Sequence, residues 1–328
     1  MPASSRRAKR NKRPYRVSRK RALVEATIPV VDWCLAPIAV LIAPLLFLIA
    51  RLGWRAGVTR SILDRVGVAL LRHHYYSPVV FPSDVRTDLD AARDLPGIDL
   101  RENEQVALLD RLSAYSPEAS VALADFDFDN PNYGRVDALV LYAMIREFGP
   151  KRVFEIGSGH STRVVAAALA QGPSPARHVC MEPFEMPWLE ATGATVLRMR
   201  VEDAPLSLFA ELEAGDVLFI DSSHAIRPQG DVVREYLEIL PMLAPGVIVH
   251  VHDVYTPHDL HPYLVLGQRK IWDEQYLMEA LLSGGDRFEV MLANYWIGRA
   301  NPGAFARVVP GFTLPPERDG CSFWLRRR

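Results

Sequence analysis

Cysteine is scarce in this chain of 328 residues. There are three cysteines, Cys34, Cys180 and Cys321, and no two of them form a Cys-x-x-Cys pair. An odd number at wide spacing excludes a disulfide-rich secreted scaffold and gives no support for a zinc site built on cysteines. The pattern favours reduced thiols and a globular body in a reducing compartment such as the cytoplasm.

A Gly-Lys dipeptide is absent from the whole chain, which excludes a phosphate-binding loop of the G-K-[ST] type. Internal repeats are absent as well. Hydrophobic residues make up 49% and charged residues 23% of the chain, and these ordinary values exclude a disordered or fibrous protein. The length allows one large or two small domains with a real core.

Net charge is also nearly absent, at −1, but this value hides two opposite parts. Residues 1–72 hold fifteen basic and three acidic side chains, a charge of +12, whereas residues 73–328 hold 23 basic and 36 acidic ones, a charge of −13. A basic segment attracts any polyanion. Because an apolar segment follows the tail directly, we expect anionic membrane lipid as its partner and no nucleic acid.

The apolar segment runs from Trp33 to Ala50 without a charge. As a helix it would span about 27 Å, close to the roughly 30 Å of hydrocarbon in a bilayer. Pro37 and Pro44 favour kinks, and basic residues flank both ends. These features predict a bent, re-entrant or interfacial anchor with both ends cytoplasmic; a single span and a buried core helix are the alternatives.

The remaining chain alternates short apolar runs with helical patterns, which predicts a doubly wound α/β fold with a mostly parallel sheet. The expected strands are 152–156, 178–182, 195–199, 216–221 and 246–253, and runs at 287–291 and 322–325 predict a closing antiparallel strand with no helix needed between them. We divide the chain into a basic tail (1–22), an anchor with its basic flank (23–72), a connecting or lid region (73–133) and an α/β domain (134–328).

Distinctive residues follow these strands, where ligands bind in such sheets. The first strand leads into Gly157-Ser158-Gly159 and then an Ala-rich helix, a turn that lets the backbone approach a ligand closely. A dinucleotide-binding fingerprint requires Gly or Ala at the position that Thr162 occupies. Glu155 suits a cationic ligand rather than pyrophosphate, and Glu182, after the second strand, can accept hydrogen bonds from ribose hydroxyls.

The pattern E-x-G-x-G with an acidic end to the second strand resembles the class I S-adenosylmethionine-dependent methyltransferases over residues 134–328. The strings VFEIGSGHSTRVV, DVLFIDSSHA and GVIVHVHDVYTP are similar to one bacterial branch of that superfamily. The resemblance implies a Rossmann-like seven-stranded sheet with one antiparallel strand. It also implies a set of S-adenosylmethionine contacts: Glu155 near the ammonium group, Gly157, Ser158 and Gly159 under the methionine part, Glu182 at the ribose, Asp203 (or the competing Glu202) near the adenine, and Asp221 near the methyl group.

The residues after the fourth and fifth strands carry the candidate chemistry. His224 is the best candidate for a general base, because neutral imidazole is available near pH 7. Alternatively, Asp221, His252 and Asp253 hold a divalent cation that lowers the pKa of the acceptor. The cleft resembles that of catechol O-methyltransferase-like enzymes, which hold magnesium here. His252 departs from their pattern and favours manganese or zinc over magnesium, or no metal. We expect His250 to be structural.

Together these features predict a membrane-associated S-adenosylmethionine-dependent methyltransferase. It would methylate a hydroxyl of a small-molecule, sugar or lipid-linked acceptor, at the bacterial inner membrane with the catalytic domain facing the cytoplasm. A non-catalytic membrane-anchored binding or scaffold protein with the same fold is one alternative, since fold does not fix function. An NAD-dependent oxidoreductase is disfavoured by Thr162 and Glu155, and a hydrolase by the missing final glycine of a nucleophile elbow. The oligomeric state is unknown from the sequence.

Overall fold

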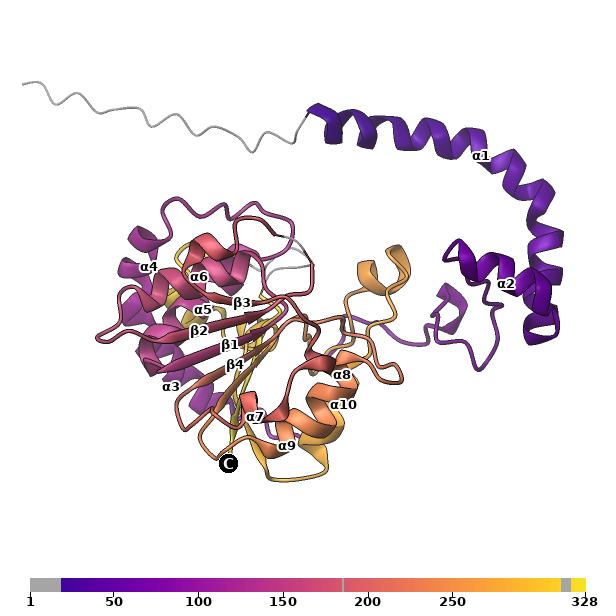
Figure 1. The fold of residues 1–328 in the computed structure, drawn as a ribbon. Helices are drawn as coiled ribbons and strands as arrows, with labels where there is room; N and C mark the ends of the chain where they lie inside the picture. Colours follow the sequence, from indigo (N-terminus) through magenta and orange to yellow (C-terminus); the bar gives the residue numbers. More distant parts are fainter. Residues whose placement is uncertain (1–18, 185, 314–319) are drawn as a thin grey trace, which may run out of the picture. The chain divides into compact units, whose positions relative to one another are not determined.

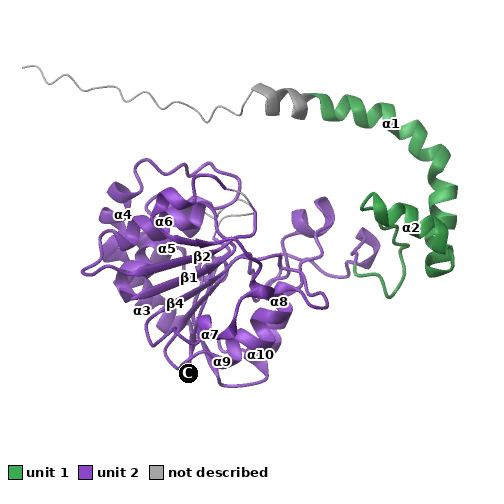
Figure 2. Cartoon of the chain, in the orientation of Figure 1, with its two compact units in different colours: residues 1–78 green, residues 79–328 purple. Residues whose placement is uncertain are grey.

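The computed structural model describes residues 19–184, 186–313 and 320–328 (Figure 1). The chain divides into two compact units, Met1–Pro78 and Val79–Arg328 (Figure 2). Most of the predicted basic tail, residues 1–18, lies outside the described residues. The domain boundaries expected at 22/23, 72/73 and 133/134 stay predictions.

The first unit is helical. Helix α1 (Arg19–Leu52) contains Pro29, Pro37 and Pro44, and it bends along its length in Figure 1. A short 3₁₀ turn, η1 (Gly53–Arg55), joins it to α2 (Gly57–Arg65). Among the described residues, Thr27–Arg55 is the one segment with the length and mean hydropathy (2.5) to cross a membrane, and it is not buried within the protein. Length and composition are the whole of this evidence.

The second unit is built on a seven-stranded sheet in the order β3-β2-β1-β4-β5-β7-β6. Strand β7 is antiparallel to both of its neighbours, and the pairs from β3 to β5 are parallel. The predicted fold class and the antiparallel strand at the C-terminus are therefore confirmed. The strands are β1 (Arg152–Ile156), β2 (Arg177–Met181), β3 (Thr195–Leu197), β4 (Val217–Ile220), β5 (Ile248–Val251), β6 (Phe288–Ala293) and β7 (Phe323–Arg327).

The antiparallel pairing of the last two strands needs no helix between them, yet the structure has two helices there, which the sequence did not predict. Helices α11 (Asn294–Ala300) and α12 (Pro302–Val308) lie between β6 and β7. Their apolar residues join the core on one face of the sheet, where Phe305 and Ile297 are fully buried. The two helices are short and each contains a glycine, so their apolar period is weak in the sequence.

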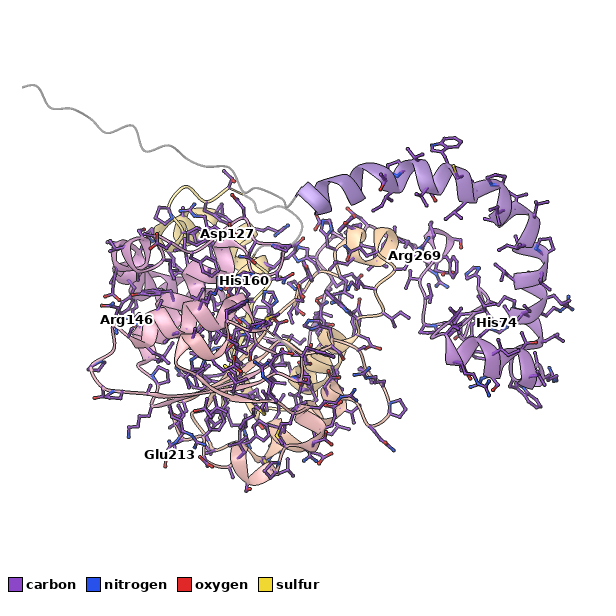
Figure 3. The ribbon with its side chains drawn as sticks, turned by 45° about the horizontal axis from the view of Figure 1, so that its top comes forward. His74, Asp127, Arg146, His160, Glu213 and Arg269 are labelled. Atoms are coloured by element: carbon purple, nitrogen blue, oxygen red, sulfur yellow. The ribbon has the colours of Figure 1, made fainter. Side chains whose placement is uncertain are left out.

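Helices cover both faces of the sheet. Alternate strand residues enter opposite cores: Val153 of β1 belongs to the core under α5 and α6, and Phe154 belongs to the core under α8 and α10. On the first face, Arg146 of α5 (Figure 3) pairs with Glu118 of α4, with 2.5 Å between Nε and Oε1. The other helices are α3 (Glu102–Leu112), α4 (Ser116–Ala122), α5 (Arg135–Phe148), α6 (His160–Leu169), α7 (Leu206–Phe209), α8 (Asp231–Arg234), α9 (Leu240–Met242) and α10 (Glu274–Ser283).

This burial on both faces explains the near-continuous apolar strands. It also leaves the loops after β1, β4 and β5 as the place where polar side chains can gather, because those loops leave the sheet at one edge.

Candidate active site

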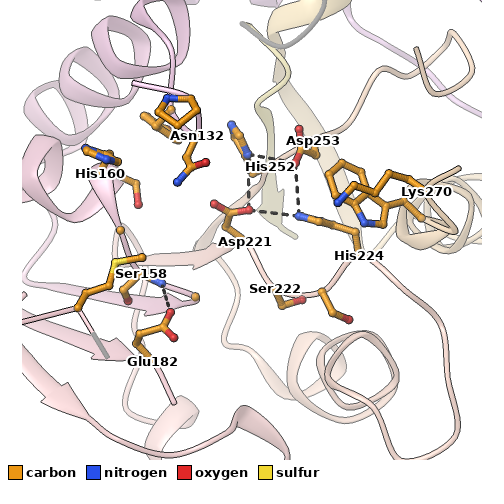
Figure 4. Close-up of a pocket in the computed structure, with 18 of the residues that line it drawn as sticks. Asn132, Ser158, His160, Glu182, Asp221, Ser222, His224, His252, Asp253 and Lys270 are labelled. Carbon is orange, nitrogen blue, oxygen red and sulfur yellow. Dashed lines mark hydrogen bonds and ion pairs between the residues drawn. The ribbon is translucent and has the colours of Figure 1, made fainter. Parts of the chain in front are cut away.

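A cavity of about 480 Å³ lies at the carboxyl ends of β1, β4 and β5 (Figure 4). A second cavity of about 330 Å³ shares Gly157, Glu182 and Asp221 with it. These volumes fall within the range of small-molecule and cofactor sites. The site therefore lies where the parallel sheet places it, beyond the strand ends.

Gly157 makes the tight turn after β1 possible. Its φ is +76°, and an added Cβ would lie 1.9 Å from the carbonyl oxygen of Asp221. The amide of Asp221 in turn donates to the carbonyl of Ile156, at 2.9 Å, so the β1 and β4 ends are held together. Gly159 is different, since a Cβ there would meet only the Cε of Met186, at 4.0 Å. Gly157 is thus required by the fold, and Gly159 leaves open space in the cavity wall.

Glu155 does not line either cavity. Its fully buried carboxylate accepts hydrogen bonds from Thr162 Oγ1, at 2.9 Å, and from Ser161 Oγ, and it pairs with His178 Nε2. The carboxylate thereby ties the start of α6 to β2. Its predicted contact with the ammonium group of a cofactor stays a prediction that this placement does not support.

Glu182 does face both cavities. One carboxylate oxygen accepts from the backbone N–H of Ser158, at 3.1 Å, and the other from that of Phe184, at 2.9 Å. Each oxygen has a further lone pair to offer a ligand. Asp203 is exposed and lines neither cavity, whereas the competing Glu202 lines the second one. Of these two residues only Glu202 reaches a cavity, and an adenine contact by either stays a prediction.

The residues after β4 and β5 form one cluster, as their strand positions predict (Figure 4). His224 Nε2 lies 3.3 Å from Asp221 Oδ1 and 3.4 Å from Asp253 Oδ2. His252 Nδ1 lies 3.5 Å from the same Asp221 oxygen and 3.7 Å from the same Asp253 oxygen. Two imidazoles thus face two carboxylates at the wall of the larger cavity.

The other ring nitrogen of His224, Nδ1, contacts Glu274, a residue to which the sequence assigned no role. Nδ1 of His224 lies 2.8 Å from Oε2 of the buried Glu274, and its ring centroid is 4.6 Å from that of Trp272. His224 and Asp253 both have left-handed backbones, with φ of 60° and 56°. Non-glycine residues in this region are strained, and such strain is found at functional sites.

Asp137, on α5, holds the other imidazole and was missed entirely. Its fully buried carboxylate lies 3.5 Å from His252 Nε2 and accepts from the backbone N–H groups of Gly320 and Ser322, at 2.8 and 3.0 Å. It therefore fixes His252 and the chain that enters β7. One signal was present in the sequence: an acid inside the apolar run VDALVLYAMI needs a buried partner.

Electrostatics in the cluster favour charged forms. Burial alone would lower the pKa of His224, but its hydrogen bonds to Asp221 and Glu274 outweigh this and raise it well above the usual range. Burial alone would raise the pKa of Asp221, but the charge of His252 and the hydrogen bond from His224 hold it well below the usual range. The neighbouring carboxylates thus favour the protonated form of His224, and a reduction of their negative charge favours the neutral form that accepts a proton.

The predicted metal ligands pass a geometric test. Three donor atoms, one each from Asp221, His252 and Asp253, all lie within 4.8 Å of one another. Ligands at about 2.1 Å from a metal, with angles of about 110–120°, would be about 3.4–3.7 Å apart, which matches the 3.5 and 3.7 Å separations from His252. One nitrogen and two oxygens suit manganese or zinc better than magnesium. Metal binding itself stays a prediction.

Two further predictions concern the cysteines, which were expected to be reduced, and His250, which was expected to be structural. All three cysteines are free thiols, and Cys321 is buried beside His252, with 3.8 Å between Sγ and Nε2. His250 lies in the core, where its ring stacks on Phe219 at 4.0 Å and Nε2 is 2.9 Å from Ser322 Oγ. It does not line the cavity.

Comparison with known proteins found a family model that matches the region around the site. Residues 154–254 match a family described as a methyltransferase domain, in agreement with the resemblance seen in the sequence. An uncharacterized protein of Archaeoglobus fulgidus is 25% identical in an alignment 173 positions long that covers 47% of this chain and 78% of that protein.

Solved structures are similar at a lower level. A methyltransferase of Podospora anserina with bound SAH is 18% identical, with a TM-score of 0.39, and the match covers 67% of this chain and 94% of that one. An O-methyltransferase of Bacillus cereus in complex with SAH is 16% identical, with a TM-score of 0.36, over 56% of this chain and 82% of that one. At these TM-scores the structural similarity carries no argument about the function of this chain.

Proposed function

We propose that this protein is a membrane-associated S-adenosylmethionine-dependent methyltransferase that methylates a hydroxyl of a small-molecule, sugar or lipid-linked acceptor. One observation carries the proposal: Gly157, Glu182 and Asp221 line two cavities that share these residues, and all three lie in the region that matches a methyltransferase domain. S-adenosylmethionine, when bound, supplies an electrophilic methyl group. The protein's own contribution is to bind it, to orient the acceptor and to move one proton.

The residues present fit this cofactor. Gly159 leaves the cavity wall open, and Glu182 retains acceptor capacity for the two ribose hydroxyls. Glu202 lines the second cavity, where an adenine amine would need an acceptor. Asp221 lines both cavities. It would therefore lie between the nucleoside of the cofactor, in the smaller cavity, and the acceptor, in the larger one.

His224 is the proposed proton acceptor. Its Nε2 faces Asp221 and Asp253, while Glu274 fixes the ring through Nδ1. In methyl transfer the acceptor oxygen would bond to the methyl carbon as the carbon–sulfur bond of the cofactor breaks, and His224 would take the hydroxyl proton. Holding the reactants in line can account for a large share of rate enhancement, and a positioned base typically adds about 10²–10⁴-fold.

A divalent cation fits beside this base. Asp221, His252 and Asp253 would hold it, and it would supply a lower pKa for the acceptor hydroxyl together with neutralisation of the two carboxylates. His252 contributes its Nδ1, because Asp137 faces its Nε2.

The membrane part of the proposal rests on the first unit. The exposed apolar segment Thr27–Arg55 carries Arg51 and Arg55 at its C-terminal end, and the sequence before it is also basic. We infer an anchor in the bacterial inner membrane with residues 73–328 on the cytoplasmic face, next to a membrane-proximal acceptor. Protease access or reporter fusions test this, and residues 73–328 on the outer side of that membrane would overturn it.

Calorimetry on the full chain in detergent tests the enzymatic part. S-adenosylmethionine should bind and NAD should not. Glu182→Ala should weaken binding about 10–100-fold, because it removes hydrogen bonds to a charged acceptor. Asp203→Ala is the matched control, since this exposed carboxylate lines neither cavity, and it should leave the affinity unchanged. Absence of S-adenosylmethionine binding defeats the proposal, and NAD binding supports an oxidoreductase instead. Binding without methyl transfer to any membrane extract supports the non-catalytic alternative.

A further inference from the structure

Helix α2, next to the proposed anchor, exposes an apolar face that nothing in the described part of its unit covers. Val58 and Ile62 are 80% and 58% exposed, and Val66, one turn further along, is 69% exposed. Residues four apart lie on the same side of a helix, so Val58 and Ile62 form one stripe, and Val66 follows directly after the last residue of α2. Leu63 is half-buried and borders a groove formed with residues 68–71. The helix thus packs on one side and presents apolar side chains on another.

The charges around α2 have one sign. Arg51, Arg55, Arg60, Arg65 and Arg72 flank or belong to the helix, and Asp64 is the one acid in residues 51–72. Arg60 and Asp64 lie on the side of α2 away from the stripe, with 3.7 Å between Nε and Oδ2, and they line the same groove as Leu63 while staying more than half exposed. Arg65, seven residues after Val58, lies beside the stripe. An apolar stripe opposite a charged face, with a basic surplus, is the pattern of helices that lie in the plane of an anionic membrane surface.

The connection to α1 is consistent with this placement. The chain leaves α1 at Leu52 through Gly53, whose φ of +54° permits a sharp turn, and α2 does not continue the line of α1 (Figure 2). Trp54 lies in this turn and is exposed, with the guanidinium of Arg55 5.0 Å from its ring. Tryptophan and arginine side chains are typical of the boundary between hydrocarbon and headgroups.

A second group of aromatic rings lies where the unit ends. Tyr75 and Tyr76 are almost fully exposed and contact each other edge to face, at 5.3 Å between centroids. The ring of His74, labelled in Figure 3, lies 5.2 Å from that of Tyr76. Exposed tyrosines are also enriched at membrane interfaces.

From these features we infer that α2 is a membrane-surface helix: it lies in the headgroup region of an anionic bilayer, with Val58, Ile62 and Val66 towards the acyl chains and Arg60 and Asp64 towards water. The inference rests on the membrane association in the proposed function and adds a second, electrostatic contact to it. Such helices insert their apolar face about 5–10 Å into the boundary of headgroups and acyl chains. The partner is therefore the anionic lipid surface itself, rather than a protein or a second copy of the chain.

Site-directed spin labelling of the full chain tests this placement. Cys34→Ser removes the exposed native thiol, and Cys180 and Cys321 are buried. Single cysteines then replace Val58 or Ile62 on the stripe, and Arg60 or Asp64 on the opposite face as matched controls. In vesicles of phosphatidylcholine with one quarter phosphatidylglycerol, labels at 58 and 62 should be accessible to oxygen and protected from a water-soluble nickel complex. Labels at 60 and 64 should show the reverse.

Three outcomes would overturn the inference. Equal exposure of all four labels to the nickel complex would place α2 in water. Protection of 58 and 62 from both oxygen and nickel would indicate a protein contact, and spin–spin broadening in addition would identify a second copy. Protection of all four labels from nickel, with oxygen access, would place α2 within the hydrocarbon.

The charge contribution has its own test. Replacing Arg60 and Arg65 by glutamine should reduce the protection of label 58 in anionic vesicles and change it little in vesicles of phosphatidylcholine alone. Equal loss in both vesicle types would contradict the role of anionic lipid. Calorimetry with S-adenosylmethionine on the same samples reports the enzymatic proposal separately, because α2 contributes no residue to the cavities.

Discussion

Replacing Gly157 by alanine tests the central geometric feature of the site. The residue has φ of +76°, and the new Cβ would lie 1.9 Å from the carbonyl oxygen of Asp221, where ordinary contact begins at 3.4 Å. The β1 loop or the β4 end must therefore move by more than 1 Å. Asp221 N donates to Ile156 O at 2.9 Å, so either movement disturbs this bond and displaces a residue of the reacting cluster.

The cost can be worked out from two contributions. An alanine in the left-handed region costs about 1–2 kcal/mol, and overpacking against backbone costs about 1–3 kcal/mol. Gly157→Ala should thus lower the free energy of unfolding by about 2–5 kcal/mol, which corresponds to a fall in Tm of about 4–20 °C for a domain of this size. Thermal unfolding followed by calorimetry measures this directly.

Gly159→Ala is the matched control. Its φ of −173° is extended backbone, and the new methyl would meet only Met186 Cε, at 4.0 Å. Its Tm should stay within about 2 °C of wild type, while S-adenosylmethionine affinity falls because the methyl group enters the cavity. If Gly157→Ala unfolds at the wild-type temperature and binds the cofactor as well as wild type, the reasoning from close approach is refuted.

Further predictions concern the charged groups. His224→Ala should keep S-adenosylmethionine affinity but slow transfer of a labelled methyl group to a membrane extract by about 10²–10⁴-fold; unchanged transfer would remove its role as base. Asp137→Asn should weaken Mn²⁺ binding about 10–100-fold in calorimetry, because His252 loses the partner of its Nε2, and an unchanged Mn²⁺ affinity would contradict this. Burial, and then the charge of Glu274, raises the pKa of Glu235 well above its usual range. The folded state therefore keeps a proton that the unfolded state releases above about pH 4.3, so stability falls as the pH rises above that value. Glu235→Gln should accordingly be more stable than wild type at pH 8 in urea unfolding and about equal to it at pH 4; a gain independent of pH would rule out this explanation.

The strands of the fold were predictable because each is a short apolar run buried on both faces. The five predicted runs from 152 to 253 correspond to β1 to β5, with ends that differ by up to two residues. The cluster of Asp221, His252 and Asp253 was predictable for the same reason, since parallel strands bring their ends to one edge. The helices between β6 and β7 were not, because they are short and owe their stability to tertiary packing rather than to period.

Side-chain direction limited the site prediction. Glu155 belongs to the motif that predicted a cofactor contact, yet its carboxylate points to Thr162 and His178 and not to a cavity. Asp203 and Glu202 are adjacent in the chain, and only the second reaches a cavity. The spacing of residues in the sequence predicts where the backbone of a strand end or turn lies. It does not predict which of two adjacent side chains points into the cavity.

The sequence by itself determined the α/β fold class, the glycine turn and the separation of charge between residues 1–72 and 73–328, because these follow from local pattern and composition. Only the tertiary structure decided which groups surround the reacting cluster. Asp137 comes from α5 and Glu274 from α10, and each reaches a histidine of the cluster from a distant part of the chain. Such contacts depend on how the helical layers pack on the sheet, which no local pattern encodes. The same packing buries both acids beside histidines.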